Sequence, residues 1–428
     1  ISEKVIEAYE KGTPLGNLAS PRKGNSTSNN NRFLRLWYEV DYNKENFKCN
    51  EIIKEDTIEK RWFPYNKGGG FRKWYGNNEY MIDWKNDAEE IRNVKTAVIA
   101  NYQYFMKPGL TWSTVSSVNF SIRKFGNGFI FDNGGCCIFD LGNKTEYILG
   151  LLNSNIFKYI FGQLNPTLNF QSGEVAKFPV VYNENFTNKI REYVNQNVTI
   201  SHYDWDNFET SWEFKEHPFL NKNFNPMYLD LVTGLPNKTI ESAFVVWKLF
   251  SGQQFIKLKS NEEELNKIFI EIYGLQDELY PEVEDNDVTI RKADRERDIK
   301  SFISYAVGCM FGRYSLDEDG LIYAGGEFDI SRYKKFIPTT DNVLIIADDD
   351  YFEDDVVNRF VEFIKVTFGE ETLEENLDYI AETLVVKTGE TSRQAIRRYF
   401  LKDFYNDHVK TYKKRPIYWQ FDSGKQNG

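Results

Sequence analysis

Hydrophobic residues recur along this chain at two different spacings, and the change of spacing separates an N-terminal from a C-terminal part. Between residues 109 and 139, short runs of β-branched and aromatic residues alternate with glycine-containing turns, a pattern typical of strands. From residue 239 onward, apolar residues recur every three or four positions, as on one face of an amphipathic helix. The pattern predicts a mixed α/β fold, with an N-terminal α/β domain followed by a mainly helical C-terminal domain.

In the N-terminal part, we expect a twisted sheet with hairpins. Residues 33–40 predict a strand, and the turns Gly126-Asn127-Gly128 and Asn133-Gly134-Gly135 are hairpin signals between aromatic runs. Residues 87–104 are expected to be helical in part. Residues 146–163 predict a helix whose apolar face contains Ile148, Leu151, Leu152, Ile156, Tyr159 and Ile160.

Further helices are expected at residues 188–198, 261–273, 294–311, 351–368 and 392–409. Asn261 followed by Glu264 forms a capping box that begins the second of these, and Gly369 ends the fourth. Residues 314–324 predict a small hairpin that turns at Asp319-Gly320. We expect three domains, which are residues 1–182, a helical connector at 183–260, and a mainly helical acidic domain at 261–428.

Composition places the chain among folded proteins without a membrane span. Its residues are 41% hydrophobic and 16% aromatic, and no apolar run approaches the ~18 residues that a transmembrane helix needs. The four cysteines contain no Cys-x-x-Cys pair, and the adjacent Cys136 and Cys137 suit neither an ordinary disulfide nor a zinc site. With no signal peptide at its start, the sequence predicts a reduced cytoplasmic protein.

The net charge of −11 hides a strong asymmetry along the chain. Residues 1–180 carry 23 Lys and Arg against 19 Asp and Glu, whereas residues 181–428 carry 30 against 45, so the two parts have charges of +4 and −15. Three windows of the first part hold five Lys or Arg each and no acid, namely residues 11–38, 60–78 and 91–131. They can form one positive surface if the fold brings them together; the alternative is an ordinary solvated face.

Residues 61–84 are the most unusual stretch, because they hold eight aromatic residues, four glycines and the cations Arg61, Lys67, Arg72 and Lys73. The aromatic residues follow neither a helical nor a strand period, and Gly68-Gly69-Gly70 interrupts any regular element. Such a loop suits a flat, negatively charged ligand, with cations on phosphates and aromatic faces against bases or sugars. The alternative is a Trp-rich loop packed on its own domain.

Three short stretches resemble catalytic motifs, but none matches its motif both in residues and in the surrounding structure. Phe125-Gly126-Asn127-Gly128 superficially resembles the loop that holds S-adenosylmethionine, but it reads as a turn between two short strands. Asn165-Pro166-Thr167-Leu168 begins like the Asn-Pro-Pro-Tyr loop of adenine methyltransferases, but it lacks the second proline and the aromatic residue. Asp204 with Glu213-Phe214-Lys215 has a spacing seen in metal-dependent nucleases, yet the segment reads as helix and loop where that site needs strands.

Histidines and acid clusters add no active site. His202, His217 and His408 lie in no nucleophile or metal pattern. The acid clusters within residues 282–285 and 348–355 resemble helix N-termini, which the helix dipole favours, more than metal sites. The chain alone therefore shows no catalytic, cofactor-binding or metal residues.

Five blocks, at residues 61–84, 102–117, 149–181, 267–317 and 397–428, resemble the target-recognition and C-terminal part of the PglX family, the adenine-specific DNA methyltransferases of BREX phage-defence systems. The first three blocks more loosely resemble the specificity regions of type IIG restriction-modification enzymes and type I specificity subunits. Because the blocks cover essentially the whole chain, they are more specific than a short motif. The resemblance implies that residues 1–182 are a DNA target-recognition domain and that double-stranded DNA is a partner.

In this family, an N-terminal domain binds S-adenosylmethionine and methylates the exocyclic amine of adenine, while the following region selects the DNA sequence. Since the chain has neither the cofactor loop nor Asn-Pro-Pro-Tyr, the resemblance implies a fragment without the catalytic domain. The intact protein would use S-adenosylmethionine, and other phage-defence proteins are a further expected partner. The alternative is a protein-interaction scaffold whose acidic C-terminal half docks such proteins, with minor DNA contact.

On this interpretation, the recognition region grips the duplex on either side of a flipped adenine. The cations expected on phosphates are Arg22, Lys23, Lys67, Lys107, Arg123 and Lys124. The side chains expected at base edges are those of Arg61 and Arg72, beside Lys73 of the same loop, and neighbouring amides, with Asn165, Asn169 and Gln171 as weaker candidates. The aromatic residues expected on sugars or beside the flipped base, unless they are core anchors, are Trp62, Tyr65, Trp74 and Trp112. The basic run at residues 393–415 either clamps DNA or, as we favour, neutralises the acidic helices before it.

Overall fold

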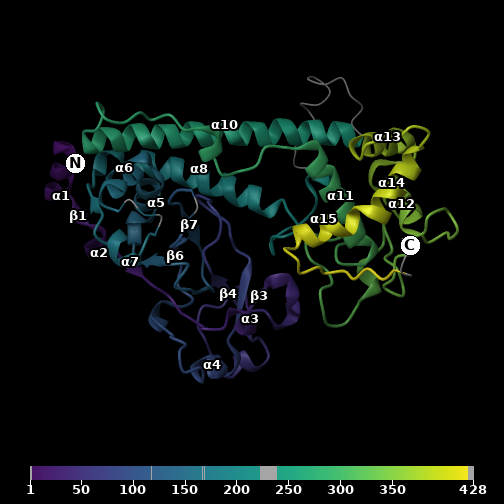
Figure 1. The fold of residues 1–428 in the computed structure, drawn as a ribbon, viewed down its shortest axis with the longest axis horizontal. Helices are drawn as coiled ribbons and strands as arrows, with labels where there is room; N and C mark the ends of the chain where they lie inside the picture. Colours follow the sequence, from purple (N-terminus) through teal and green to yellow (C-terminus); the bar gives the residue numbers. More distant parts are fainter. Residues whose placement is uncertain (1, 117, 166, 168, 222–238, 423–428) are drawn as a thin grey trace. The chain divides into compact units, whose positions relative to one another are not determined.

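The computed structural model describes residues 2–116, 118–165, 167, 169–221 and 239–422 (Figure 1). Its fold is mixed α/β, as the sequence pattern predicted. The chain divides into two compact units: unit 1 comprises Ile1–Trp205 and Gln254–Ile290, and unit 2 comprises Asp206–Gln253 and Arg291–Gly428. These bounds differ from the three expected ranges, because helices α8 (Thr187–Asp206) and α10 (Ile240–Tyr273) each contribute residues to both units.

The described part of unit 1 contains two four-stranded sheets and one two-stranded sheet. The first, in the order β2-β9-β6-β7, is antiparallel throughout and consists of β2 (Ser20–Arg22), β9 (Cys137–Phe139), β6 (Gly109–Trp112) and β7 (Ile122–Phe125). The second, in the order β3-β5-β4-β8, consists of β3 (Leu34–Leu36), β5 (Tyr80–Asp83), β4 (Trp62–Asn66) and β8 (Ile130–Phe131), and only its β4-β8 pair is parallel. The short β1 (Thr13–Pro14) pairs with β10 (Pro179–Val180).

The two turns that were expected to close hairpins instead carry the chain between the sheets. Residues 126–128 lead from β7 in the first sheet to β8 in the second, and residues 133–135 lead from β8 back to β9. Turn residues favour a reversal of the backbone, but long-range packing decides with which other strand each flanking strand pairs. The two hairpin predictions were therefore wrong, and β6 and β7 form the antiparallel pair of this region.

Unit 1 also contains the following helices, most of which pack on an apolar core that includes Leu110 and Ile138 of the first sheet. They are α1 (Glu3–Lys11), α2 (Leu15–Leu18), α3 (Asn30–Phe33), α4 (Lys85–Arg92), α5 (Thr145–Asn153), α6 (Asn155–Leu164), α7 (Ser172–Val175), α8 and the second part of α10. The helix predicted at residues 146–163 is divided into α5 and α6, because Ser154 takes extended backbone angles (φ −80°, ψ 164°).

The capping box predicted at Asn261 does not begin a helix, since α10 continues through this position without interruption. Asn261 is buried, and its amide nitrogen lies 2.9 Å from Asn197 Oδ1 of α8. The amide thus links two helices rather than satisfying a helix end. This prediction was wrong because a local pattern cannot show that a polar side chain has a partner 64 residues away.

Unit 2 is mainly helical. Its further helices are α11 (Arg295–Met310), α12 (Val356–Phe368), α13 (Leu373–Thr383), α14 (Ser392–Lys402) and α15 (Phe404–Thr411). Asp294 caps α11, whose start the sequence predicted, and Asp355 of one acid cluster caps α12, which begins at Val356 and not at the expected residue 351. Gly369 ends α12 with a φ of +96°, also as predicted.

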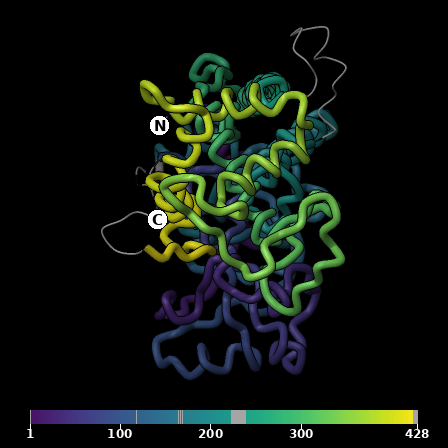
Figure 2. The backbone as a smooth tube through the Cα atoms, turned by 90° about the vertical axis from the view of Figure 1, so that its right-hand side faces the viewer, coloured from purple at the N-terminus to yellow at the C-terminus, as the bar shows by residue number. Residues whose placement is uncertain are grey.

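Residues 311–355, between α11 and α12, form a long irregular segment, which Figure 2 traces in green. The hairpin predicted at residues 314–324 is wrong, because no strand occurs among these described residues. The Gly320 amide instead donates to the Lys215 carbonyl, so this turn is held by another loop of unit 2. Across the described residues, no helix is both long and apolar enough to cross a membrane.

Candidate nucleic-acid interface

Six of the thirteen side chains expected to contact DNA are buried inside unit 1. They are Tyr65, Arg72, Lys73, Trp74, Trp112 and Arg123, and none is more than 7% exposed. A side chain enclosed to this degree cannot reach a phosphate or a base edge from its present position. We therefore assign these six residues a structural role in place of the expected direct contact.

The Arg72 guanidinium fastens its loop to helix α8. Its Nη2 lies 2.8 Å from Asp204 Oδ2 and also donates to the Ser201 carbonyl, while Nη1 donates to the Thr289 carbonyl. The guanidinium also lies 4.9 Å from the centre of the Trp205 ring. Because either buried charge without its partner would destabilise the fold, this ion pair holds the loop in place. Asp204 therefore serves the fold and is unsuited to the nuclease site considered above.

Lys73 and Trp74 share one carboxylate of helix α10. Lys73 forms a buried ion pair with Glu262, and the Trp74 indole nitrogen lies 2.7 Å from Glu262 Oε1. Burial raises the pKa of the Glu262 carboxyl, although the Lys73 ammonium and the indole oppose this shift. Residues 72–74 are thus packed on their own domain, which is the alternative that we held for this part of the loop.

Trp112 and Arg123 belong to the first sheet. The Trp112 indole nitrogen donates to the Phe170 carbonyl at 2.8 Å, and one Arg123 nitrogen donates to the Arg72 carbonyl at 3.2 Å. Burial lowers the pKa of Arg123 to about 10, and the neighbouring Arg72 charge adds to the shift. Both side chains therefore connect the sheet with loops that lie over it.

Asp132 organises the surface loops beside these buried groups. Its Oδ2 accepts from the Tyr65 hydroxyl at 2.9 Å, and its Oδ1 lies 2.8 Å from Lys67 Nζ and 2.7 Å from the Gly134 amide nitrogen. The carboxylate is buried, whereas the Lys67 side chain stays 26% exposed. One carboxylate thus fixes the loop after β4, the turn after β8 and the base of a surface lysine.

Five loop segments of unit 1 are hydrogen-bonded to one another in what we call the loop cluster, which consists of residues 23–26, 67–70, 113–116, 133–135 and 169–172. The bonds that connect them are Asn133 N to Asn25 O, Thr114 N to Gly134 O, Ser113 Oγ to Gly69 O, and Phe170 N to Thr114 O. The approach is so close that a Cβ at Gly135 would lie 2.3 Å from the Asn66 carbonyl oxygen. Since Lys23, Gly69, Gly70, Val115 and Asn169 are exposed, the cluster is a surface whose shape is fixed from beneath.

Two further cations meet at the ring of Tyr104, outside the loop cluster. Arg22 and Lys107 each lie 5.4 Å from the centre of the Tyr104 ring, and Lys23 follows Arg22 in the chain. Arg22 pairs with Cys137 across β2 and β9, two residues beyond the turn at residues 133–135. The loop cluster contains residues 23–26, 67–70 and 113–116, one segment from each acid-free window, so the fold does bring these windows together.

Arg61, Trp62 and Lys124 lie away from this cluster of cations. Arg61 forms an ion pair with Asp83 and lies 5.4 Å from the centre of the half-buried Trp62 ring, at the opposite end of β4 from Lys67. Lys124 Nζ lies 3.0 Å from Glu146 Oε1. The structure therefore places Lys23 and Lys67 in the loop cluster, with Arg22 beside Lys23 and Lys107 before the start of β6, and leaves Arg61, Trp62 and Lys124 at other positions of unit 1.

Sequence reasoning missed Asp132, Asn133 and Tyr104 as parts of this surface. Asn133 was noticed only as a turn residue, and Tyr104 only as the end of a helical segment. The basic windows gave a usable signal for Tyr104, because its ring lies between two of their cations. The sequence gives no comparable signal for Asp132, since its partners Tyr65 and Lys67 lie more than 60 residues earlier.

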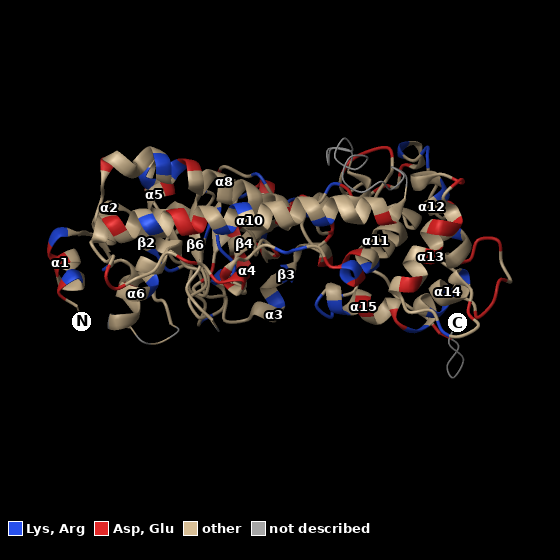
Figure 3. Ribbon diagram, turned by 90° about the horizontal axis from the view of Figure 1, so that it is seen from above, with Lys and Arg blue, Asp and Glu red and all other residues tan. Residues whose placement is uncertain are grey.

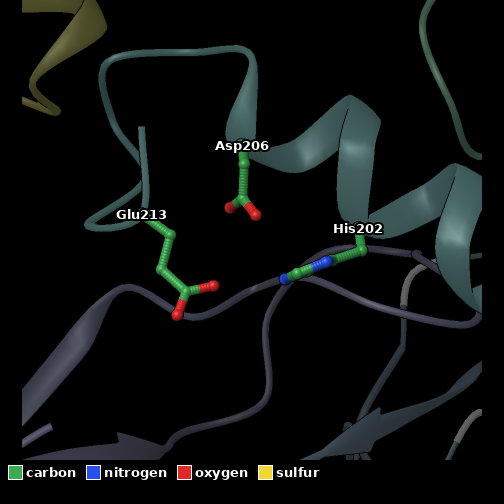
Figure 4. A group of neighbouring side chains, drawn as sticks. All are labelled: His202, Asp206 and Glu213. Carbon is green, nitrogen blue, oxygen red and sulfur yellow. The ribbon is translucent and has the colours of Figure 1, made fainter. Parts of the chain in front are cut away.

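Two further motifs are explained by local contacts among the described residues, whereas Asn165-Pro166-Thr167-Leu168 lies partly outside them. The turn at residues 126–128 leads into a strand rather than a helix, and its Asn127 amide lies 2.8 Å from Asn50 Oδ1. It therefore lacks the helix N-terminus against which a nucleotide-like cofactor binds, and does not fit S-adenosylmethionine. Figure 4 shows His202 and Asp206 near the end of α8, and Glu213 on the loop that follows. The His202 ring packs against Tyr75 at 4.1 Å between centroids, which explains the histidine by packing within unit 1.

In unit 2, the first cations of the C-terminal basic run neutralise acids, as we favoured. Arg397 forms a buried ion pair with Asp355, and Arg393 and Arg398 form ion pairs with Glu374 and Glu390. These pairs connect α14 with the segments before it. The acids of residues 341–378 thus have part of their counter-charge within the same unit.

Comparison with known proteins shows the family to which the chain belongs. No model of a known protein family matches it. It is 44% identical over 441 aligned residues to the adenine-specific methyltransferase PglX of Lacticaseibacillus casei (strain Zhang), which covers all of this chain and 35% of that protein. It is 37% identical over 425 residues to the adenine-specific methyltransferase BrxX of Escherichia coli O9:H4 (strain HS), which covers 92% of this chain and 33% of that protein. The chain spans about a third of the length of these curated relatives. It is therefore a PglX-like protein, homologous over its whole length to one part of these methyltransferases.

Proposed function

We propose that this chain selects and grips double-stranded DNA for an adenine-specific methyltransferase of phage defence. Unit 1 is the target-recognition part, and its loop cluster faces the duplex. The cations Arg22, Lys23, Lys67 and Lys107 contact phosphates on either side of the target adenine. This grip supports the rotation of the adenine out of the base stack, which costs a few kcal/mol.

The observation that carries this proposal is the meeting of three acid-free windows in one loop cluster, which contains Lys23 and Lys67. Loops held by a rigid scaffold are the usual place for binding residues, and glycine lets the backbone come close to a ligand. Asp132, which is the buried acid at this surface, already has Lys67 as its partner. The homology to proteins named adenine-specific methyltransferases favours DNA as the polyanion that binds at this surface.

Methyl transfer itself belongs, on this proposal, to residues outside these 428. The transfer uses S-adenosylmethionine as methyl donor, and the relatives have about twice this length in addition to the matched part. The matched part positions the duplex, and the additional part performs the chemistry. The protein then acts in the cytoplasm, where the genome and the cofactor are found.

A salt titration of duplex binding tests the proposal. Four phosphate contacts predict a slope of about −3.6 in log affinity against log salt concentration, or a loss of about 150-fold between 50 and 200 mM salt. Replacing Arg22, Lys23, Lys67 and Lys107 with alanine should abolish most of this slope. A matched control replaces the exposed lysines Lys158, Lys177 and Lys189 of the same unit. Binding that is absent, or equally salt-dependent in the quadruple variant, would contradict the proposal.

A scaffold that docks other defence proteins remains a second candidate function, supported by one feature of unit 2. Tyr351 and Phe352 are 66% and 50% exposed on a loop rich in Asp and Glu, the residue types that Figure 3 colours red. Arg397 holds this loop at both ends, through Asp355 and the Ala347 carbonyl. Exposed aromatic side chains on an anchored loop are typical of interface anchors. If a protein that co-purifies with the chain is lost from the Tyr351→Ala/Phe352→Ala variant while DNA binding persists, unit 2 has this docking function.

A further inference from the structure

We infer that Asn169, Gln171 and Val115 form a base-reading site for an A·T pair in the major groove. This inference rests on the proposed function, since it requires the loop cluster to face DNA. It goes further, because phosphate contacts position a protein on a duplex without reading its sequence.

The two amides are presented outward by a buried anchor between them. Phe170 is 7% exposed, its amide nitrogen donates to the Thr114 carbonyl, and its carbonyl accepts from the Trp112 indole. Asn169 pairs with Val115 in an antiparallel bridge, so the backbone is extended here. Neighbouring side chains of extended backbone point to opposite faces, so Asn169 and Gln171 lie on the face opposite Phe170.

The amides are also oriented by each other. Gln171 Nε2 lies 2.7 Å from Asn169 Oδ1, which leaves the Gln171 carbonyl oxygen as an acceptor and the Asn169 amide group as a donor. Turning both amides over exchanges these roles, but still leaves one donor and one acceptor. In either orientation, the pair presents complementary groups side by side.

This combination matches one base edge better than the others. In the major groove, adenine shows a donor at N6 next to an acceptor at N7, whereas guanine shows two acceptors. Its partner thymine adds a methyl group, and Val115, which is 69% exposed beside Asn169, is an apolar side chain suited to contact it. Lys23 and Lys67, which belong to the same loop cluster, set the register by their phosphate contacts.

Selection of bound sites from random duplexes tests this inference, with the chain in the full-length context in which it is encoded. We expect the unmutated protein to select an A·T pair at a fixed position. The Asn169→Ala/Gln171→Ala variant should lose this preference by about 10-fold or more, while its affinity for unselected DNA is unchanged. Asn188→Ala/Asn195→Ala, which removes exposed amides of α8, is the matched control. A thermal melt equal to that of the parent shows that the variant is folded.

A second readout addresses Val115 separately. Replacing thymine with uracil at the selected pair removes one methyl group and should weaken binding about fourfold, whereas Val115→Ser should not respond to this change. If the double-amide variant selects the same sites with the same preference, the inference is wrong while the proposed function stands. If the unmutated protein binds no duplex at all, both are wrong.

Discussion

At the scale of single residues, burial decides how a cation can act. Arg72 and Lys73 were attractive as DNA contacts, but each is enclosed and paired with a carboxylate of a distant helix. Exposed pairs contribute little to stability, whereas breaking a buried pair leaves a charge without compensation. Lys23 and Lys67, which stay accessible to solvent, are therefore better candidates for DNA contacts than the more conspicuous Arg72.

Replacing Arg72 with methionine should destabilise unit 1 by about 3–5 kcal/mol, because Asp204 remains buried without its partner. Chemical denaturation measures this change in the free energy of unfolding. Arg92→Met is the matched control, since the ion pair of Arg92 with Asp87 is largely exposed and should contribute less than about 1 kcal/mol. Equal stability of the two variants, with DNA binding lost only in Arg72→Met, would show that Arg72 contacts DNA directly.

His217 should make unit 2 sensitive to acid. Burial lowers its pKa to about 3, whereas the unfolded chain binds the proton near pH 6.5. As the pH falls below 6.5, only the unfolded state gains this proton, so the free energy of unfolding falls by about 1.4 kcal/mol per pH unit. The His217→Gln variant should show a shallower loss between pH 6 and 4.5 in denaturation experiments. A pH dependence identical to that of the parent would refute this role.

At the scale of elements, the loop cluster depends on one carboxylate. Asp132→Ala removes the shared acceptor of Tyr65, Lys67 and Gly134, and each lost buried hydrogen bond costs about 1–3 kcal/mol. We expect the amides of residues 67–70 and 133–135 to exchange with deuterium about 10-fold faster or more, while those of α5 are unchanged. Asp132→Asn keeps the shape of the side chain, so its exchange rates should lie between those of the parent and those of Asp132→Ala. Unchanged exchange in Asp132→Ala would mean that other contacts hold these loops.

Elements also show what a sequence can predict. The start of α11 at Asp294 and the end of α12 at Gly369 were predicted, because capping is a local interaction, whereas α12 begins after Asp355 and not at residue 351 as expected. The partners of Arg72 and Lys73 were not, since Asp204 and Glu262 lie 132 and 189 residues further along the chain. Turn residues failed to predict strand pairing for the same reason. Charge indicated only that the basic windows could form one surface; that the windows meet, and that Arg72, Lys73 and Arg123 are buried, could be recognised only from the fold.

At the scale of the whole molecule, the proposed function assigns different tasks to the two units. Unit 1 carries the converging cations, while the acid-rich loops with exposed aromatic residues belong to unit 2. The chain aligns with about a third of each methyltransferase relative, so the account requires that this third determines which DNA sequence is methylated. The rest of the protein then determines only that adenine is the methylated base.

An exchange of this region tests that requirement most directly. In one chimera, these 428 residues replace the aligned part of PglX from L. casei (strain Zhang), and the reciprocal chimera carries the opposite exchange. Sequencing of methylated adenines in cells that carry each protein gives the four motifs. If this region selects the DNA sequence, the methylated motif will follow the exchanged region in both chimeras. A motif that stays with the remainder of the protein would contradict it.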